Sequence, residues 1–163
     1  MLTLQLIRHA KTEQLSRTGK DFDRQLMEKG IAQANLLGNY IQSHHLEMGK
    51  ILCSSATRTR QTHSIICQQT SEPCSIEYRD ELYLASREGL LAGLAGEKSR
   101  TLTLIGHNEG ISELVSYCAD EYLSMKTAEF ITLSFPFESW DHVSRGTGII
   151  SLRYRPAVFL PEC

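Results

Sequence analysis

Hydrophobic and polar positions near the start of the chain change from a spacing of two to the spacing of a helix. Leu2, Leu4 and Leu6 alternate with polar residues, which predicts a strand that ends just before Arg8. Apolar residues then recur every three or four positions, which predicts a helix over roughly residues 28–43. The members of this apolar stripe are Ala34, Leu37, Tyr40 and Ile41.

The middle of the chain repeats the order of strand and helix. Residues 51–53 form a candidate buried strand, and a helix is expected from near Thr57 to the break at residues 71–73. Ser86 is a residue type that caps helices, so a short helix is expected after it, with Gly96 at its end.

The last third of the chain ends in strands. We expect a strand over residues 102–105 and then a helix over residues 111–118, with Asn108 as its N-cap. Alternation returns over residues 131–137 and again over residues 150–154, which predicts two further strands. Strands that alternate with helices indicate a layered α/β sheet.

Length and composition exclude several classes of protein. The 163 residues fit a single domain, residues 1–163. The 17 Lys and Arg residues against 19 Asp and Glu leave a net charge of −2, which argues against nucleic acid or an anionic membrane as the main partner. No apolar run approaches the ~20 residues of a membrane span, and the chain does not start like a signal peptide. Five scattered cysteines without C-x-x-C spacing favour reduced thiols, so we expect a cytoplasmic protein.

Three segments place basic or imidazole side chains in the loop between a predicted strand and a predicted helix. The side chains concerned are Arg8 and His9, then Arg58, then His107. Ligands of open α/β sheets bind beyond the carboxyl ends of the strands, so parallel strands would bring these loops to one crevice. Two guanidinium and two imidazole groups without a matching carboxylate predict a site for a dianion such as phosphate. Helix N-termini near Thr57 and Asn108 would add N–H donors.

An imidazole among arginines suits phosphoryl transfer. A neutral imidazole nitrogen attacks phosphorus well when a hydrogen bond to its other nitrogen fixes the tautomer. Arginines stabilise the charge on the transferred group. This scheme requires no metal or other cofactor, and the sequence shows no ligand cluster. We expect the remaining histidines to be surface residues: His44, His45, His63 and His142.

Each segment also has a plainer interpretation. An Arg-His pair after a strand often forms only local ion pairs, Gly and Asn often mark a turn, and Ser54-Ser55 can be a capping pair. The prediction of a site rests on the occurrence of all three segments, in order, at matching positions of the fold.

Taken together, the segments resemble the signatures of the histidine phosphatase superfamily, which has the phosphoglycerate mutase-like fold. The matching motifs are R-H-A at residues 8–10, S-S-A-T-R-T-R-Q-T at residues 54–62 and G-H-N at residues 106–108. The resemblance implies a three-layer α/β/α sandwich with a mostly parallel mixed sheet. It also implies that His9 is the phosphate-accepting nucleophile. By the same resemblance, Arg8, Arg58 and His107 complete the phosphate pocket and Asn108 contacts the substrate.

A further segment narrows the resemblance. D-F-D-R-Q-L-M-E-K-G at residues 21–30 is similar to the D-F-D-R-P-L-T-x-x-G segment of small bacterial phosphohistidine phosphatases of the SixA type, and the similarity spans essentially the whole chain. Arg24 in this segment is a hypothesis for substrate binding at the pocket rim. An ion pair with Asp21 or Asp23 alone is an equally good interpretation.

The sequence departs from the family pattern at three positions. Ser55 and Gln25 stand where proline is usual, and Glu109 follows G-H-N where proline is common. None of these changes removes a charged group from the predicted pocket. Glu109 places a carboxylate beside the anion site, and we expect its side chain to point away.

Many members of the superfamily carry a glutamate as general acid in an L-x-E context, where this chain has Leu84. Asp80 and Glu81 lie near that position but out of step with the motif. An alkoxide, whose conjugate acid has a pKa near ~15.7, departs badly without a proton donor. An imidazole group titrates near ~6.5 and needs less help. The missing acid therefore favours phosphohistidine over phosphate esters as substrate.

These arguments predict a phosphohistidine phosphatase that forms a phospho-His9 intermediate. The resemblance alone implies its partner, a phosphorelay protein such as a histidine-containing phosphotransfer domain. One alternative is a small-molecule or peptide phosphomonoesterase that uses Asp80 or Glu81 as a displaced acid. Another is a catalytically inert module that binds phosphate or a partner. The oligomeric state is not predicted.

Overall fold

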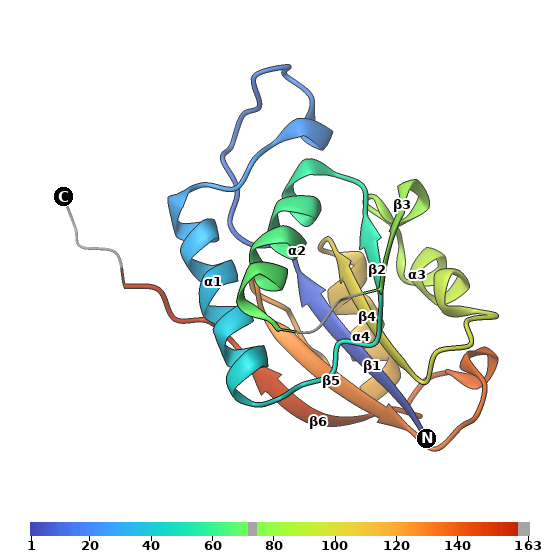
Figure 1. The fold of residues 1–163 in the computed structure, drawn as a ribbon. Helices are drawn as coiled ribbons and strands as arrows, with labels where there is room; N and C mark the ends of the chain where they lie inside the picture. The colour runs from blue at the N-terminus through green and yellow to red at the C-terminus, as the bar shows by residue number, and fades with distance from the viewer. Residues whose placement is uncertain (72–74, 160–163) are drawn as a thin grey trace.

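The computed structural model describes residues 1–71 and 75–159, and their strands form one six-stranded sheet in the order β3-β2-β4-β1-β5-β6 (Figure 1). The strands are β1 (Leu2–Arg8), β2 (Lys50–Ser54), β3 (Ser75–Arg79), β4 (Thr101–Gly106), β5 (Phe130–Phe135) and β6 (Ile149–Tyr154). Strands β3, β2, β4 and β1 are parallel, while β5 runs antiparallel to β1 and β6 antiparallel to β5. The predicted mixed, mostly parallel sheet is confirmed.

Helices cover both faces of the sheet (Figure 1). They are α1 (Glu28–Ser43), α2 (Thr57–Gln69), α3 (Arg87–Leu94) and α4 (Gly110–Ala119), with short 3-10 turns η1 (Asp21–Asp23), η2 (Asp80–Leu82) and η3 (Trp140–His142). In the described residues, no helix combines the length and the apolar character that a membrane crossing requires.

The alternation of side chains along β1 divides the core into two layers. Leu4 and Leu6 belong to a buried cluster that includes Leu114 of α4. Ile7 belongs to a second cluster, with Leu37 of α1 and Ile66 of α2. Successive side chains of a strand point to opposite faces, so β1 holds the two helical layers together. The result is the three-layer α/β/α arrangement that the resemblance implied.

Most predicted elements are present, but two details differ. Strand β3 was not predicted, because it is a short strand at the sheet edge in which only Ile76 and Tyr78 are apolar and every side chain is exposed or half-buried. The prediction that Asn108 caps α4 is wrong, since Glu109 precedes this helix and no side chain caps it. The cap at Ser86 is confirmed, because its Oγ accepts a hydrogen bond from the Gly89 amide at 3.2 Å. Residues 72–73 of the predicted helix break lie outside the described residues.

The register of the parallel strands aligns the ends that carry the predicted motifs. Arg8 at the end of β1 pairs with Gly106 at the end of β4, and Cys53 of β2 pairs with Ile105 of β4. The loops that follow β1, β2 and β4 therefore lie together at the carboxyl ends of these strands, as expected for an open α/β sheet.

Candidate active site

A cavity of about 310 Å³ lies where these three loops meet. It is lined by all of the residues that the sequence pointed to, namely Arg8, His9, Arg24, Arg58, His107 and Asn108. The tertiary structure thus brings together side chains that lie up to a hundred positions apart in the sequence.

His9 is held as a neutral imidazole in one orientation. Its Nδ1 lies 2.8 Å from the Ala10 carbonyl oxygen, and a carbonyl can only accept, so Nδ1 carries the proton and Nε2 is left unprotonated. Burial, together with the nearby charges of Arg58 and Arg8, lowers the pKa of His9 to about 3. At neutral pH the ring is uncharged and its Nε2 lone pair is available.

His107 lies beside His9, with the two ring centroids 5.4 Å apart. Its Nε2 is 2.7 Å from the hydroxyl of Ser54 at the end of β2. Burial, with the charge of Arg58 next in importance, lowers the pKa of His107 to about 3. Its Nδ1 is buried and has no hydrogen-bond partner.

Arg58 is 1% exposed and enters the site from the first turn of α2. Its two terminal nitrogens donate to Asp21, at 2.8 Å to the carbonyl and at 3.0 Å to Oδ2. Arg8 donates from Nη1 to the Met125 carbonyl at 2.9 Å. Burial lowers the pKa of the Arg8 guanidinium from its usual value.

Three buried nitrogens in this site lack a partner. They are Nε of Arg8, Nε of Arg58 and Nδ1 of His107, and over residues 1–71 and 75–159 no other buried side-chain nitrogen or oxygen is left unsatisfied. A buried polar group without a hydrogen bond is unfavourable by about 1–3 kcal/mol. All three unsatisfied groups belong to residues predicted to surround an anion, and a phosphoryl group has the oxygens to satisfy them.

The expectation that the site has no matching carboxylate is wrong, because Asp21 lines the cavity. Its Oδ1 accepts from Arg24 Nε at 2.9 Å, and its Oδ2 accepts from Arg58 and from the Tyr83 hydroxyl. The Tyr83 hydrogen bond and the charge of Arg58 lower the pKa of Asp21 to about 2. Asp21 belongs to the D-F-D-R segment, but the loop motifs did not indicate that this segment packs against α2.

Arg24 combines the two interpretations offered for it. It pairs with Asp21, and it also lines the cavity, where its Nη1 donates to Thr12 Oγ1 at 2.9 Å. Asn108 lines the cavity as well, and its Oδ1 accepts a hydrogen bond from Ser112 at 2.5 Å.

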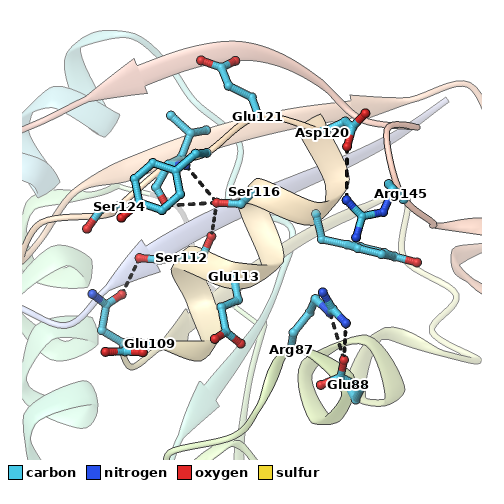
Figure 2. A pocket seen from close by; sticks show the side chains of 14 residues that line it. Arg87, Glu88, Glu109, Ser112, Glu113, Ser116, Asp120, Glu121, Ser124 and Arg145 are labelled. Carbon is cyan, nitrogen blue, oxygen red and sulfur yellow. Dashed lines mark hydrogen bonds and ion pairs between the residues drawn. The ribbon is translucent and has the colours of Figure 1, made fainter.

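Glu109 lies beside a different cavity, as expected. That cavity, of about 720 Å³, runs along α4 and shares only Asn108 with the described lining of the cavity around His9 (Figure 2). Asp80 accepts a hydrogen bond from Ser55, and Glu81 lines a third cavity, so neither candidate acid lines the cavity around His9. Leu84 occupies that wall instead.

Two other expectations concern residues outside this site. His63 is not a surface residue, since it is 8% exposed and contacts the Tyr78 hydroxyl and the Cys67 sulfur. In the described residues, no group of three or more His, Cys, Asp or Glu side chains is arranged to hold a metal ion.

The protein has an α/β fold, and the cavity at the carboxyl ends of its parallel strands contains a neutral, buried histidine together with arginines. This arrangement suits a phosphoryl group. The chain belongs to the histidine phosphatase superfamily (branch 1), whose family model matches residues 4–92, and it is a phosphatase. Its sheet and helices form the phosphoglycerate mutase-like fold of that superfamily.

Individual relatives cover most of the chain. An uncharacterised protein of Mycobacterium tuberculosis (strain H37Rv) is 30% identical over 133 residues, which are 80% of this chain and 81% of that protein. The structure of a candidate phosphohistidine phosphatase SixA from Nakamurella multipartitia has a TM-score of 0.83 at 25% identity and covers 96% of this chain and 97% of its own. That of a similar candidate from Agrobacterium tumefaciens has a TM-score of 0.82 at 25% identity, with 95% and 98% covered. The chain therefore resembles SixA-type members over nearly its whole length.

Proposed function

We propose that this phosphatase hydrolyses phosphohistidine on a phosphorylated protein through a covalent phospho-His9 intermediate. One observation carries the proposal: three unsatisfied buried nitrogens belong to residues that line the same cavity as a histidine whose Nε2 lone pair is free. The groups that would bind the phosphoryl oxygens and the group that would attack phosphorus thus belong to one cavity.

In the first step, Nε2 of His9 attacks phosphorus of a phosphohistidine that is protonated on its other ring nitrogen; the nitrogen–phosphorus bond of the substrate breaks, and its imidazole leaves as the neutral ring. The Ala10 carbonyl accepts the Nδ1 proton and so stabilises the positive charge that develops on the His9 ring. Arg8 and Arg58 donate to the equatorial oxygens of phosphorus. We assign the His107 proton to Nδ1, with the Ser54 hydroxyl donating to Nε2, so that Nδ1–H can donate a hydrogen bond to another phosphoryl oxygen.

In the second step, water attacks phosphorus of phospho-His9, the bond to Nε2 breaks, and inorganic phosphate leaves. His9 returns to its neutral form with the proton still on Nδ1. The side chains already named supply every contact in both steps, so the proposed scheme includes no cofactor.

Phosphohistidine is favoured over phosphate esters by the protonation state of the site. Asp21 is the one carboxylate among the described lining residues, and its pKa of about 2 keeps it ionised, so it is a poor proton donor at neutral pH. An ester alkoxide requires such a donor far more than an imidazole does. Two of the similar structures are those of candidate phosphohistidine phosphatases, which agrees with this preference.

The partner that we propose is a histidine-containing phosphotransfer domain, with small phosphate compounds as the alternative substrates. Such a partner would place the protein in the cytoplasm. Cys53 and Cys118 are buried free thiols, which fits a reducing compartment.

The test compares kcat/KM on a protein phosphorylated on histidine with kcat/KM on a panel of phosphate esters. Faster turnover of the esters would reject the proposed substrate. Labelled phosphate should also be trapped on the wild-type enzyme in acid-labile form, and His9→Ala should trap none. Equal trapping by the two proteins would reject His9 as the nucleophile, and no trapping or turnover by the wild type would favour the inert module.

A further inference from the structure

A further cavity, of about 430 Å³, adjoins the cavity around His9, which we call the phosphate cavity, and shares Arg8, Lys11 and Thr127 with it. Its charged lining residues are all cationic: Arg8, Lys11, Lys29, Lys126 and Arg155. Among the described residues, no carboxylate lines it. We call it the basic groove.

Four separate segments form the basic groove. Lys11 follows β1, Lys29 lies in the first turn of α1, Lys126 precedes β5, and Arg155 follows β6. These segments lie far apart in the sequence, so sequence patterns alone did not indicate the cluster.

Close backbone packing holds the segments that carry Lys11 and Lys29 together. At Gly30, an added Cβ would lie 1.9 Å from the Lys11 carbonyl oxygen, so only glycine allows α1 to approach the Lys11 loop this closely. The same carbonyl accepts a hydrogen bond from the Met27 amide at 3.1 Å. The position of Lys29 next to Lys11 is therefore a consequence of backbone geometry.

Gln33 connects the Lys11 loop to the loop that contains Lys126 and Thr127. Its side chain is 6% exposed; its Oε1 accepts from the Lys11 amide at 2.9 Å, and its Nε2 donates to Thr127 Oγ1 at 3.1 Å. Because both ends of this buried amide are satisfied, the Lys11 loop and the Lys126–Thr127 loop are fixed relative to each other. The groove is thus built on a rigid floor.

Within the described residues, the four cations of the groove other than Arg8 are not held in ion pairs. In the described part of the chain, no ion pair involves Lys11, Lys29, Lys126 or Arg155. These four side chains are exposed, and a concentration of like charge in a protein with a net charge of −2 creates a local positive potential. The cavity of Figure 2, which meets the phosphate cavity at Asn108, is lined by residues of both charges, including Glu109, Glu113 and Arg87. The purely cationic lining is thus particular to the basic groove.

We infer that the basic groove binds acidic side chains that lie beside the phosphohistidine on the surface of the protein substrate. The inference rests on the proposed function, because it assigns the surroundings of the phosphoryl group to a protein. Lysines are mobile point charges on long side chains, which suits several carboxylates of varied position better than one fixed second phosphate. The exposed Phe159 at the groove edge adds an apolar surface that a protein partner can cover.

The test uses the double variant Lys29→Glu/Lys126→Glu, which reverses two exposed charges outside the phosphate cavity. Its matched control is Lys98→Glu, an exposed lysine that lines a different cavity. With a phosphorylated phosphotransfer domain of acidic surface, we expect KM to rise at least about fivefold and kcat to stay the same. With free phosphohistidine, kcat/KM should change less than about twofold. The control should behave like the wild type with both substrates.

A competition experiment distinguishes the two possible anionic ligands of the groove, which are the carboxylates of a protein and a second phosphate. An unphosphorylated acidic peptide should inhibit turnover of the phosphodomain by the wild type and lose this effect with the double variant. If only inorganic pyrophosphate shows such a difference, the groove serves a second phosphate and the inference is wrong. The inference is also wrong if the double variant treats both substrates like the wild type or impairs both equally. A wild type that hydrolyses neither phosphohistidine substrate would instead reject the proposed function itself.

Discussion

Asp21 and Arg58 form an ion pair inside the phosphate cavity, with 3.0 Å between Asp21 Oδ2 and the Arg58 Nη2. The Asp21 carbonyl accepts a second hydrogen bond from the same guanidinium, at 2.8 Å. Arg58 is thereby fixed with its Nε unpaired. The carboxylate orients the guanidinium, but its negative charge also opposes the binding of a phosphoryl dianion.

Asp21→Asn separates these two effects. The amide keeps the shape of the side chain but removes the negative charge, so we expect inorganic phosphate to inhibit the variant at lower concentrations than the wild type. Because Arg58 and Arg24 are less well aligned, kcat should fall about tenfold. Steady-state kinetics with phosphate as inhibitor measure both effects. Asp23→Asn is the control, since Asp23 does not line the cavity. Weaker phosphate binding by Asp21→Asn would contradict this account.

Arg58→Ala should lower kcat by about 10²–10³-fold, because one preorganised donor to the developing charge is lost. Arg60→Ala is a matched control on the same helix. Arg60 stacks on the Tyr78 ring at 4.0 Å and does not line the cavity, so its loss should change kcat less than about threefold. Comparable losses in the two variants would reject the assignment of Arg58 to the phosphate site.

The free energy of unfolding should fall as the pH is lowered from 6.5 towards 3. The pKa values of His9 and His107 are about 3 in the folded protein, below the ordinary value of 6.5. Within this window the unfolded chain binds more protons, so each imidazole destabilises the folded state by on the order of 1 kcal/mol per pH unit. Above pH 6.5 the contribution is constant. Denaturant unfolding of the wild type and of His9→Gln at pH 7, 6, 5 and 4 measures it. Parallel curves for the two proteins would contradict the lowered pKa of His9.

Gly30→Ala should destabilise the protein by about 1–3 kcal/mol, because the added methyl group would overlap the Lys11 carbonyl and the backbone would have to move. Activity should fall as well, since Lys11 directly follows Ala10, whose carbonyl holds His9. Gly89→Ala is the control. Its nearest contact would be an ordinary 3.4 Å, so this helical site should gain about 0.5–1 kcal/mol. Thermal or denaturant unfolding measures both changes, and a stable, active Gly30→Ala variant would contradict the packing argument.

The sequence predicted those elements whose apolar residues are buried on a regular period. Strand β1 and helix α1 have such patterns, because the strand alternates between two core layers and the helix buries one side. Strand β3 lies at the sheet edge and offers only two apolar positions, Ile76 and Tyr78, neither of them buried, so its pattern is too short to predict a strand.

The sequence by itself determined which side chains stand at the ends of the strands, and therefore that His9, Arg58 and His107 share a site. Local order was enough there, because parallel strands bring the loops at their carboxyl ends to one edge of the sheet. Only the tertiary structure decided that Asp21 pairs with Arg58 and that Lys29 of α1 joins Lys11 and Lys126 in the basic groove. These contacts depend on how segments that are distant in the sequence pack against one another. The spacing of apolar residues within one segment carries no information about such packing.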